Sequence, residues 1–171
     1  MILGRDTAET IDGRGGNDTI CAGKGNDNVS GSARMDIILG GDGNDKLRGG
    51  GGDDRILGNN GNDRLLGESG DDLLLGRAGN DDLRGGSGKD RTGGGSGQDH
   101  VDGGSGDDML DDQKLGGKGH DQLFGGSGRD RVRTAGGTDD SVDCGPGRDS
   151  VLMDQGDRQE RCENISFKVA A

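Results

Sequence analysis

The sequence predicts an all-β protein, a parallel β-solenoid in which two nine-residue repeats make one coil. The first observation is an aspartate that recurs every nine residues, a period of the kind that solenoid proteins show. Fifteen residues, called here the frame aspartates, carry this period: Asp18, Asp27, Asp36, Asp45, Asp54, Asp63, Asp72, Asp81, Asp90, Asp99, Asp108, Asp121, Asp130, Asp140 and Asp149. Four extra residues, 112–115, interrupt the period once, and one more residue is inserted before Asp140.

Two further positions of the repeat support the same fold. When the frame aspartate is numbered position 6, position 4 is glycine in thirteen of the fifteen repeats and position 1 is glycine in twelve. Position 8 is aliphatic in fourteen repeats, and only Thr92 departs from this rule. The repeat 40–48, Gly-Gly-Asp-Gly-Asn-Asp-Lys-Leu-Arg, contains the whole pattern. One inward aliphatic residue per repeat predicts a thin, continuous core.

Each position of the repeat has an expected structural role. Glycines at positions 1, 2 and 4 permit positive φ angles and let backbone carbonyls come close together. Asparagine at position 5, as in Asn26 and Asn44, is expected to adopt the left-handed conformation that this residue tolerates. Positions 7 to 9 are expected to form a three-residue strand whose middle residue points inward. Strands on the same side then stack about 4.8 Å apart, so that about seven coils extend roughly 35 Å.

The composition excludes an ordinary globular core. Of 171 residues, 41 are glycine, 25% are apolar and 1% are aromatic, and the formal net charge is −12. Such a chain cannot bury enough apolar surface to offset the entropy of ordering its glycines. The acids are 29 aspartates against 4 glutamates, and short aspartate side chains are typical of turns and cation-binding loops. No segment is long and apolar enough to span a membrane, and no leader sequence is visible.

The repeat Gly-Gly-x-Gly-x-Asp-x-U-x, in which U is a large aliphatic residue, resembles the nonapeptide of the RTX, or haemolysin-type, calcium-binding repeats. The resemblance extends from Gly13 to Leu152. It implies a right-handed parallel β-roll with two repeats per coil. It also implies that Ca²⁺ ions lie between successive loops on the same side, with the frame aspartate carboxylates and loop carbonyls as ligands.

The residues by themselves also favour calcium over other metals. Carboxylate and carbonyl oxygens in glycine-rich loops suit Ca²⁺, whereas two histidines and three cysteines scattered along the chain make no zinc or copper set. Same-side carboxylates about 5 Å apart would repel by roughly 1 kcal/mol per neighbouring pair even in water. We therefore expect a chain that is disordered without metal and folds on binding calcium.

The frame aspartates define thirteen gaps between same-side neighbours, seven on one side and six on the other. The loop 32–36 places Arg34 and Met35 where glycine and asparagine belong, so the two gaps that use this loop are expected to be weak or empty. By analogy with the family geometry, about eleven Ca²⁺ sites remain. Eleven ions would change the formal net charge from −12 to about +10.

The period divides the chain into three parts. Residues 1–12 are expected to be a degenerate and truncated first repeat, residues 13–152 the roll with its insertion at 112–115, and residues 153–171 a C-terminal cap. After Asp149, the next frame position falls on Arg158.

The cysteines and the last apolar residues predict how the roll ends. Cys144 and Cys162 are 18 residues apart, one full coil, which predicts a disulfide, with two free thiols as the alternative. Cys21 has no such partner and is expected to be free. Three alternating apolar residues predict a capping strand: Ile165, Phe167 and Val169.

Alternate repeats face opposite sides, so the outward residues belong to two faces. One face carries apolar residues among arginines: Ile37, Leu39, Leu57, Leu73, Leu75 and Met109, with Arg55 and Arg91. The other is basic: Asn28, Lys46, Arg48, Arg64, Arg84 and His100. An apolar patch often marks an interface, and a basic face suits an anionic polymer. The favoured explanation of the apolar face is strand propensity or a flank covered by the remainder of a larger protein, and that of the basic face is a solvated surface that balances the aspartates.

The sequence contains no recognisable catalytic constellation. His100 and His120 each neighbour an aspartate and are expected to be solvated surface residues. Position 3 lacks the regular threonines of an ice-binding array, and the aliphatic column at position 8 argues against a disordered calcium buffer.

The predicted function is therefore that of a calcium-binding structural or stabilising module of a secreted or cell-surface protein, outside the cell where calcium is millimolar. The alternative is a free-standing adhesive solenoid that uses its apolar or basic outer face. The expected partners are calcium ions and either the remainder of a larger secreted protein or a surface partner. Neither nucleic acid nor a membrane span is expected.

Overall fold

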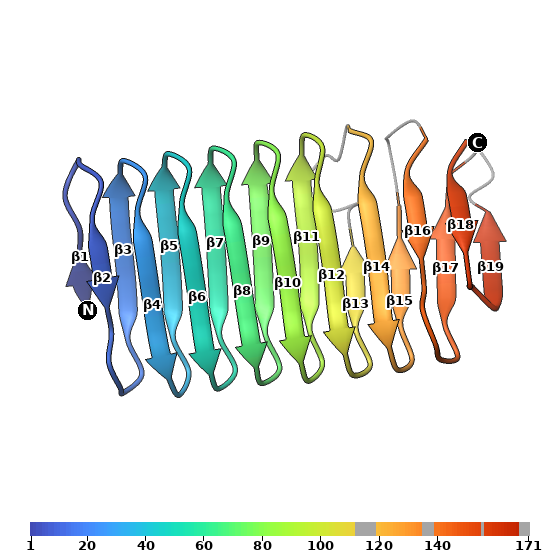
Figure 1. Ribbon diagram of the computed structural model, residues 1–171, viewed down its shortest axis with the longest axis horizontal. Helices are drawn as coiled ribbons and strands as arrows, with labels where there is room; N and C mark the ends of the chain where they lie inside the picture. The colour runs from blue at the N-terminus through green and yellow to red at the C-terminus, as the bar shows by residue number, and fades with distance from the viewer. Residues whose placement is uncertain (112–118, 135–138, 155, 168–171) are drawn as a thin grey trace.

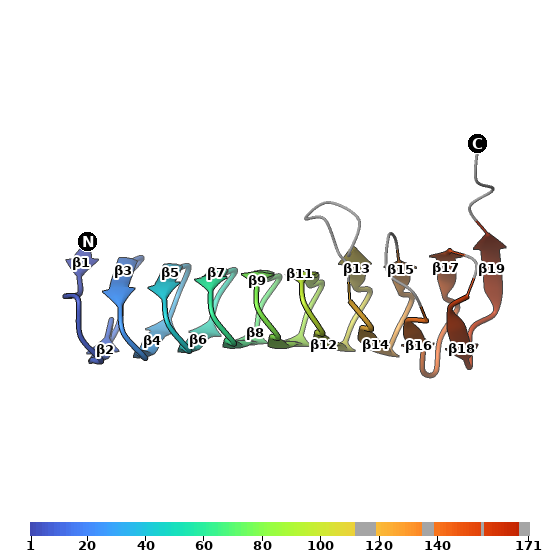
Figure 2. The same cartoon turned by 90° about the horizontal axis from the view of Figure 1, so that it is seen from above.

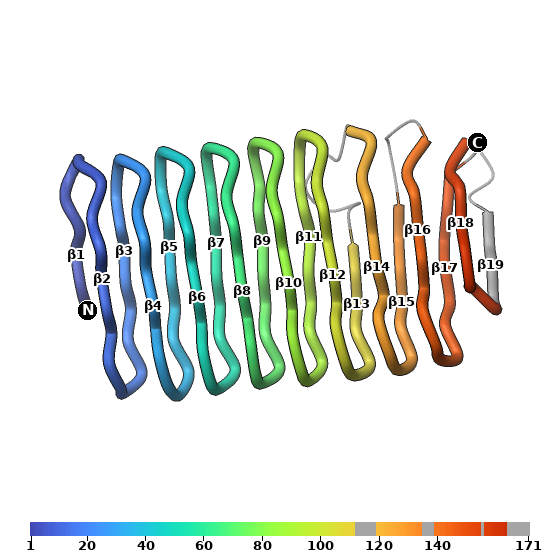
Figure 3. The backbone as a smooth tube through the Cα atoms, in the orientation of Figure 1, coloured from blue at the N-terminus to red at the C-terminus, as the bar shows by residue number. Residues whose placement is uncertain are grey.

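The computed structural model describes residues 1–111, 119–134, 139–154 and 156–167, and in these ranges the regular structure is entirely β-strand. The strands form two parallel sheets, one of ten strands and one of nine, which are the two layers of a solenoid (Figure 1, Figure 2). The chain passes from one sheet to the other after each strand (Figure 3). An all-β parallel β-roll is thus confirmed. The described part of the chain contains no helix that could cross a membrane.

The odd sheet consists of the odd-numbered strands and the even sheet of the even-numbered strands. The odd sheet contains β1 (Ile2–Leu3), β3 (Thr19–Lys24), β5 (Ile37–Asp42), β7 (Arg55–Asn60), β9 (Leu73–Ala78), β11 (Arg91–Ser96), β13 (Met109–Asp111), β15 (Arg131–Arg133), β17 (Ser150–Met153) and β19 (Asn164–Phe167). The even sheet contains β2 (Thr10–Asp12), β4 (Asn28–Ala33), β6 (Lys46–Gly51), β8 (Arg64–Ser69), β10 (Asp82–Ser87), β12 (His100–Ser105), β14 (Gln122–Ser127), β16 (Ser141–Asp143) and β18 (Arg158–Glu160).

Each coil contains two repeats, as the pairing register establishes. Ile38 of β5 lies opposite Ile56 of β7, 18 residues later. Across the insertion the even sheet continues without a break, with Val101 of β12 opposite Leu123 of β14. The stacking of even-sheet coils is therefore the same across the four extra residues of the sequence as elsewhere.

A single column of aliphatic side chains fills the space between the sheets. The position 8 residues point inward and are almost fully buried: Ile20, Val29, Ile38, Leu47, Ile56, Leu65, Leu74, Leu83, Val101, Leu110, Leu123, Val132, Val142 and Val151. Thr92, the exception to the aliphatic pattern, is buried at the same place. Because each coil orders eighteen residues and adds only two such side chains, apolar burial alone offsets little of the entropy of folding.

Most strands contain six residues, which corrects the expected length of three. The strand Arg55–Asn60, for example, covers positions 7 to 9 of one repeat and positions 1 to 3 of the next. Gly58 at position 1 is buried like Ile56 two residues earlier, so the alternation of inward and outward residues continues past position 9. Pairing continues as well, with Asn59 opposite Arg77. The position 1 glycine therefore belongs to the strand rather than to the turn.

The left-handed backbone positions are 2 and 4, and the prediction for asparagine at position 5 was wrong. Gly79 at position 4 has a φ of 131°, and Arg77 at position 2 takes a φ of 86° although it is not glycine. The asparagines instead connect neighbouring coils. Oδ1 of Asn44 accepts a hydrogen bond from the backbone N–H of Asn62 at 2.8 Å. The amide therefore acts as an acceptor between coils, which does not require a positive φ at its own backbone.

Residues 1–12 are part of the same stack. Ile2 lies opposite Ile20 in the odd sheet, and Ile11 is buried in the even sheet. Glu9 occupies the frame position 18 residues before Asp27, and its backbone N–H donates a hydrogen bond to Asp27 Oδ1 at 2.8 Å. The repeat is degenerate in that a longer acid replaces the aspartate.

The stack also continues beyond Asp149, with a change of register. Ser141 of β16 lies opposite Arg158 of β18. The frame position is therefore held by Asp157 and not by Arg158, because this coil is one residue shorter than the period predicts. The last strand, β19, pairs in parallel with β17 and includes Ile165, while Val169 lies outside the described residues.

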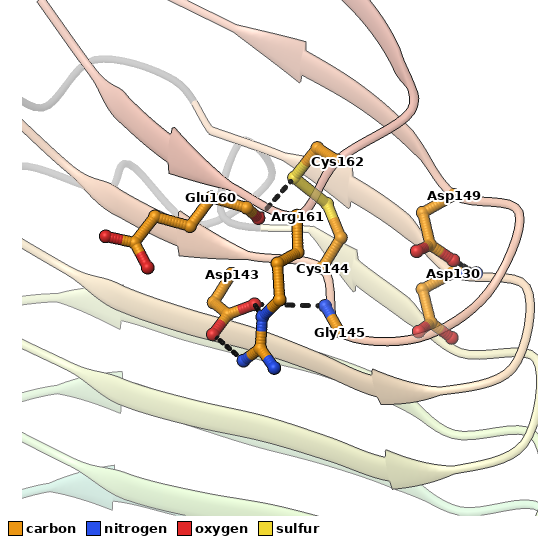
Figure 4. The surroundings of a disulfide bond; sticks show 8 residues. All are labelled: Asp130, Asp143, Cys144, Gly145, Asp149, Glu160, Arg161 and Cys162. Carbon is orange, nitrogen blue, oxygen red and sulfur yellow. Dashed lines mark hydrogen bonds and ion pairs between the residues drawn. A yellow bond between two sulfur atoms is a disulfide. The ribbon is translucent and has the colours of Figure 1, made fainter.

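A disulfide joins the last two even-sheet coils. Cys144 and Cys162 are bonded, with their Cα atoms 5.1 Å apart (Figure 4). Beside the disulfide, the guanidinium of Arg161 donates hydrogen bonds to the carboxylate of Asp143 and forms an ion pair with it (Figure 4). Cys21 is a free cysteine. Together the disulfide and the ion pair attach the segment that follows β18 to the end of β16.

Candidate metal sites

The frame aspartates stand in two columns along opposite edges of the roll. Each frame aspartate immediately precedes a strand, and the odd and even strands run in opposite directions (Figure 1). Column A, at the starts of the odd strands, contains Asp18, Asp36, Asp54, Asp72, Asp90, Asp108, Asp130 and Asp149. Column B, at the starts of the even strands, contains Asp27, Asp45, Asp63, Asp81, Asp99, Asp121 and Asp140. The structure therefore brings together, coil by coil, all fifteen residues that the sequence predicted as ligands.

One oxygen of each frame carboxylate holds the coils together. Oδ1 of Asp72 accepts a hydrogen bond from the backbone N–H of Asp54 at 2.7 Å, and Oδ1 of Asp90 accepts one from Asp72 at 2.9 Å. In column B, Oδ1 of Asp81 accepts the same bond from Asp63 at 2.8 Å. These bonds fix each carboxylate beneath the loop of the neighbouring coil.

The second oxygen has a different environment. In thirteen frame aspartates of the described ranges, Oδ2 is buried and receives no hydrogen bond: Asp18, Asp27, Asp36, Asp45, Asp54, Asp63, Asp72, Asp81, Asp90, Asp99, Asp108, Asp130 and Asp140. A buried carboxylate oxygen without a partner costs free energy, and native proteins contain few of them. It recurs at a fixed position in both columns, so each column contains a series of buried oxygens that could act as cation ligands.

The position 1 glycine explains how this oxygen can be buried. A Cβ atom at Gly67 would lie 2.3 Å from Asp72 Oδ2, and one at Gly85 would lie 2.4 Å from Asp90 Oδ2. A side chain added at either of these glycines would therefore displace the carboxylate. At these coils the carboxylate occupies the space of the missing side chain, whereas Ala22 holds position 1 before the buried Asp27.

Loop carbonyls lie along the same columns. A Cβ atom at Gly79 would lie 1.9 Å from the carbonyl oxygen of Gly61, and one at Gly88 would lie 2.0 Å from that of Gly70. Within the described ranges, no three side chains of histidine, cysteine, aspartate or glutamate gather around one point. A cation here would therefore need backbone carbonyls in addition to carboxylates. This set of hard oxygen donors fits Ca²⁺ and does not fit Zn²⁺.

Burial raises the pKa of eleven frame carboxyls above their ordinary value of 3.8: Asp36, Asp45, Asp54, Asp63, Asp72, Asp81, Asp90, Asp99, Asp108, Asp130 and Asp140. The pKa rises to about 7 for Asp81 and to about 6 for Asp54 and Asp72. Loss of solvation is the largest cause, the backbone hydrogen bond opposes it, and the negative charge of neighbouring frame aspartates adds to it. The pKa is also raised to about 6 for Asp45, Asp90, Asp99, Asp130 and Asp140. The folded carboxyls therefore favour added positive charge, whether a proton or a metal ion.

Without calcium, the folded fraction is expected to fall as the pH rises from about 4 to about 7. Frame carboxyls such as those of Asp72 and Asp81 have a higher pKa in the folded chain than in the unfolded chain, so the folded state binds more protons. Stability from this source is complete below the ordinary pKa of 3.8 and is lost as the pH rises through about 6 to 7. Far-ultraviolet circular dichroism in chelator across this range measures the effect. A β-signal in chelator that does not change, or that grows toward neutral pH, would contradict it.

The exceptional loop 32–36 keeps the backbone path of the other loops. Ser32 and Arg34 adopt φ angles of 85° and 74° although neither is glycine. Asp36 remains buried, and its Oδ1 accepts the hydrogen bond from the backbone N–H of Asp18 at 2.7 Å. The weakness of the sites beside this loop stays a prediction that rests on the charge and bulk of its side chains.

Asp157 is the frame residue that the period did not predict. Its Oδ1 accepts a hydrogen bond from the backbone N–H of Asp140 at 3.2 Å. Its Oδ2 accepts hydrogen bonds from the Thr134 hydroxyl at 2.6 Å and from the backbone N–H of Asp154 at 2.9 Å. Both oxygens are thus satisfied by the protein itself, so column B ends on a carboxylate that needs no cation. A search allowing a one-residue deletion after Asp140 would have identified it.

The histidines differ from each other. His120 is exposed, whereas His100 stacks on Phe124 with ring centres 5.1 Å apart, and its Nδ1 lies 3.7 Å from the carboxylate of Asp82. Within the described residues, neither histidine joins a group of three histidine, cysteine, aspartate or glutamate side chains that could hold a metal ion. His100 is thus a surface residue, with 42% of its side chain exposed, whose ring also stacks on Phe124.

The two-layer roll with aspartate columns at both edges defines a class of protein, the calcium-binding β-rolls. A family model described as the RTX calcium-binding nonapeptide repeat matches residues 3–33, 30–65, 57–91, 94–111 and 115–141. These matches cover most of the chain, and the chain belongs to this family of calcium-binding repeats. A search of curated proteins finds no match.

Proposed function

We propose that this chain is an extracellular calcium-binding module that folds on calcium and stabilises a secreted or surface protein. The observation that carries the proposal is the set of thirteen buried Oδ2 atoms without hydrogen-bond partners. Thirteen such oxygens would destabilise the fold at neutral pH, and Ca²⁺ ions beside them would reverse that effect. Calcium binding and folding are then one equilibrium.

The fifteen frame aspartates are the proposed ligands, together with loop carbonyls of adjacent coils. Ions would occupy the gaps between successive loops of each column, and about eleven of the thirteen gaps would bind well because the loop 32–36 borders the other two. At that occupancy the formal net charge of −12 becomes about +10. The saturated protein would then migrate as a basic protein although its sequence is acidic.

The extracellular location is supported by two features. About eleven calcium sites in one chain suit surroundings in which calcium is abundant, as it is outside cells. The disulfide between Cys144 and Cys162 forms and persists in oxidising compartments. The frame carboxylates are the largest set of buried acids among the described residues, and they accept hydrogen bonds from neighbouring coils. This use in the contacts between coils supports a structural rather than a catalytic role.

A titration with calcium, followed by far-ultraviolet circular dichroism, tests the proposal. The expected result is a cooperative transition from coil to β-structure near millimolar Ca²⁺, absent with the same concentration of Mg²⁺, which demands a smaller octahedral site. Addition of chelator should reverse it. A chain already folded in chelator at neutral pH would overturn the proposal that calcium is required, and a chain that stays unfolded with calcium would overturn calcium-driven folding.

The alternative function, a free-standing adhesive solenoid, has one observation in its favour. Leu39, Leu57 and Leu75 stack in register on the outer face of the odd sheet and are only partly buried. A continuous aliphatic stripe of this kind is typical of an interaction surface. It is equally compatible with a stabilising module whose neighbouring domain covers this face.

A further inference from the structure

The outer face of the even sheet carries a row of position 9 residues, and the charge of the central six reverses at their middle. Asp12 and Ser30 precede these six in the row, and Glu160 follows them. The six come from successive coils, from β6 to β16, and each lies opposite the next in the pairing register: Arg48, Leu66, Arg84, Asp102, Phe124 and Asp143. In this order the six are positive, apolar, positive, negative, apolar, negative. The sequence predicted a basic face, and that holds only for its N-terminal half.

We propose that this face binds a second copy of the chain, even sheet against even sheet, with the two solenoids antiparallel. A two-fold axis that runs along the strand direction, between β10 and β12, reverses the order of the row. It places Arg84 opposite Asp102 of the second copy and Leu66 opposite Phe124 of the second copy. Arg48 meets Asp143 of the second copy. Because the operation is two-fold, each of these pairs occurs twice.

A second row on the same face is compatible with this arrangement. Position 7 of the same strands carries Lys46, Arg64, Asp82, His100, Gln122 and Ser141. The same axis places Asp82 opposite His100 of the second copy and Arg64 opposite Gln122. Lys46 meets Ser141. No two like charges face each other across the axis. Within one chain, the row places the cations Lys46 and Arg64 next to the anion Asp82.

The apolar members of the row are exposed in the single chain. Phe124 is one of only two phenylalanines in the sequence and is 36% exposed. Leu66, its counterpart across the axis, is partly exposed as well. Large side chains that pair across an interface contribute most of the binding free energy of such surfaces. The His100 ring, stacked on Phe124, fixes the position of this contact.

The dimensions of the face predict a weak dimer. Six strands about 4.8 Å apart and about six residues long cover roughly 600 Å² per copy, which is near the lower limit for a specific interface. Three charged members of the row also have ion-pair partners within the chain: Arg48 with Glu68, Arg84 with Asp82 and Asp143 with Arg161. The pair of Arg84 with Asp102 lies next to the proposed axis, so charge reversal at this pair tests the interface most directly.

Sedimentation equilibrium of the calcium-saturated protein over a range of micromolar concentrations tests the inference. The expected result is a reversible monomer–dimer equilibrium that weakens as salt is added, since charged pairs are screened. The inference rests on the calcium-folded roll, so circular dichroism is recorded on the same samples. A chain that folds with calcium but has a monomer mass at every concentration overturns the dimer and leaves the proposed function standing.

Charge reversal identifies the surface. Arg84→Asp and Asp102→Arg each create two like-charge contacts across the axis, and each should weaken dimerisation about tenfold or more. The double variant Arg84→Asp/Asp102→Arg restores opposite charges and should dimerise again. An equimolar mixture of the two single variants should form a heterodimer, because one copy then carries only acids and the other only arginines at these positions.

The matched control is Arg91→Asp, which makes the same charge change on the outer face of the odd sheet. This variant should dimerise like the unaltered chain. Dimerisation that is lost in the control and retained in the even-sheet variants would overturn the assignment. Failure of the two single variants to associate when mixed would overturn it as well, provided that circular dichroism shows both to be folded.

Discussion

Replacing Gly79 by alanine should lower the free energy of unfolding by at least about 3 kcal/mol in saturating calcium. Gly79 has a φ of 131°, which side-chain-bearing residues rarely adopt, and an added Cβ would lie 1.9 Å from the carbonyl oxygen of Gly61. Backbone on both sides of this contact is paired with neighbouring coils, so neither coil can move away alone. Chemical denaturation at fixed calcium measures the loss.

Gly15→Ala is the matched control, because it adds the same methyl group to another loop glycine. Nothing lies within 4 Å of a Cβ atom at Gly15. Its substitution should change the free energy of unfolding by no more than about 0.5 kcal/mol. Equal losses at Gly79 and Gly15 would mean that the general entropy of glycine, and not the contact between coils, causes the effect.

The sequence predicts the fold and the buried aliphatic column at position 8, because both depend only on an aliphatic side chain recurring at a fixed spacing. Ile56 and Leu74 must point inward if the strands alternate, and the spacing of eighteen residues places them in adjacent coils. The frame aspartates were located for the same reason. Both results need only the period, which the sequence repeats fifteen times.

The sequence did not predict the features that depend on which contacts a residue makes in the folded chain. Glycine is typical of turns, yet Gly58 lies in a strand. A glycine is needed there because the carboxylate of Asp63 occupies the space that a side chain would fill. Asn44 tolerates a positive φ but is used as an acceptor between coils. Asp157 escaped the period because a deletion of one residue moves the predicted frame position to Arg158.

The different roles of the two carboxylate oxygens also could not be predicted from the sequence. The residue type predicts a ligand, whereas the structure reveals that Oδ1 is already engaged with the preceding coil and only Oδ2 is without a hydrogen bond in residues such as Asp72. A frame aspartate therefore has two separate effects, one on the contact between coils and one on the cation. Asparagine keeps the first, since its Oδ1 is also an acceptor, and removes the second.

The double variant Asp72→Asn/Asp90→Asn separates these two effects. The two residues border three gaps in column A, those between Asp54 and Asp72, Asp72 and Asp90, and Asp90 and Asp108. The number of bound calcium ions should therefore fall by about three, and folding should require more calcium. Calorimetric titration gives the number of ions, and circular dichroism gives the calcium midpoint.

The control is Asp53→Asn/Asp71→Asn, which removes the same charge from exposed residues one position earlier in the loops. Asp53 Oδ1 accepts a hydrogen bond from the backbone N–H of Asp71 at 3.0 Å, and asparagine can retain this bond. This variant should bind the same number of ions as the unaltered chain. An equal loss in both variants would indicate that overall charge, rather than the frame position, determines the binding.

In chelator, the effect of Asp72→Asn/Asp90→Asn should reverse sign. Burial raises the pKa of Asp72 and Asp90 to about 6, so at neutral pH the metal-free fold must hold both as buried anions. A neutral amide at the same place has a smaller cost of burial than an anion. The variant should therefore be more folded than the unaltered chain without calcium and less stable with it. A loss of stability under both conditions would mean that the carboxylates stabilise the roll by themselves. If the variant changes stability in opposite directions with and without calcium, then column A destabilises the metal-free roll and stabilises the roll only when calcium is bound.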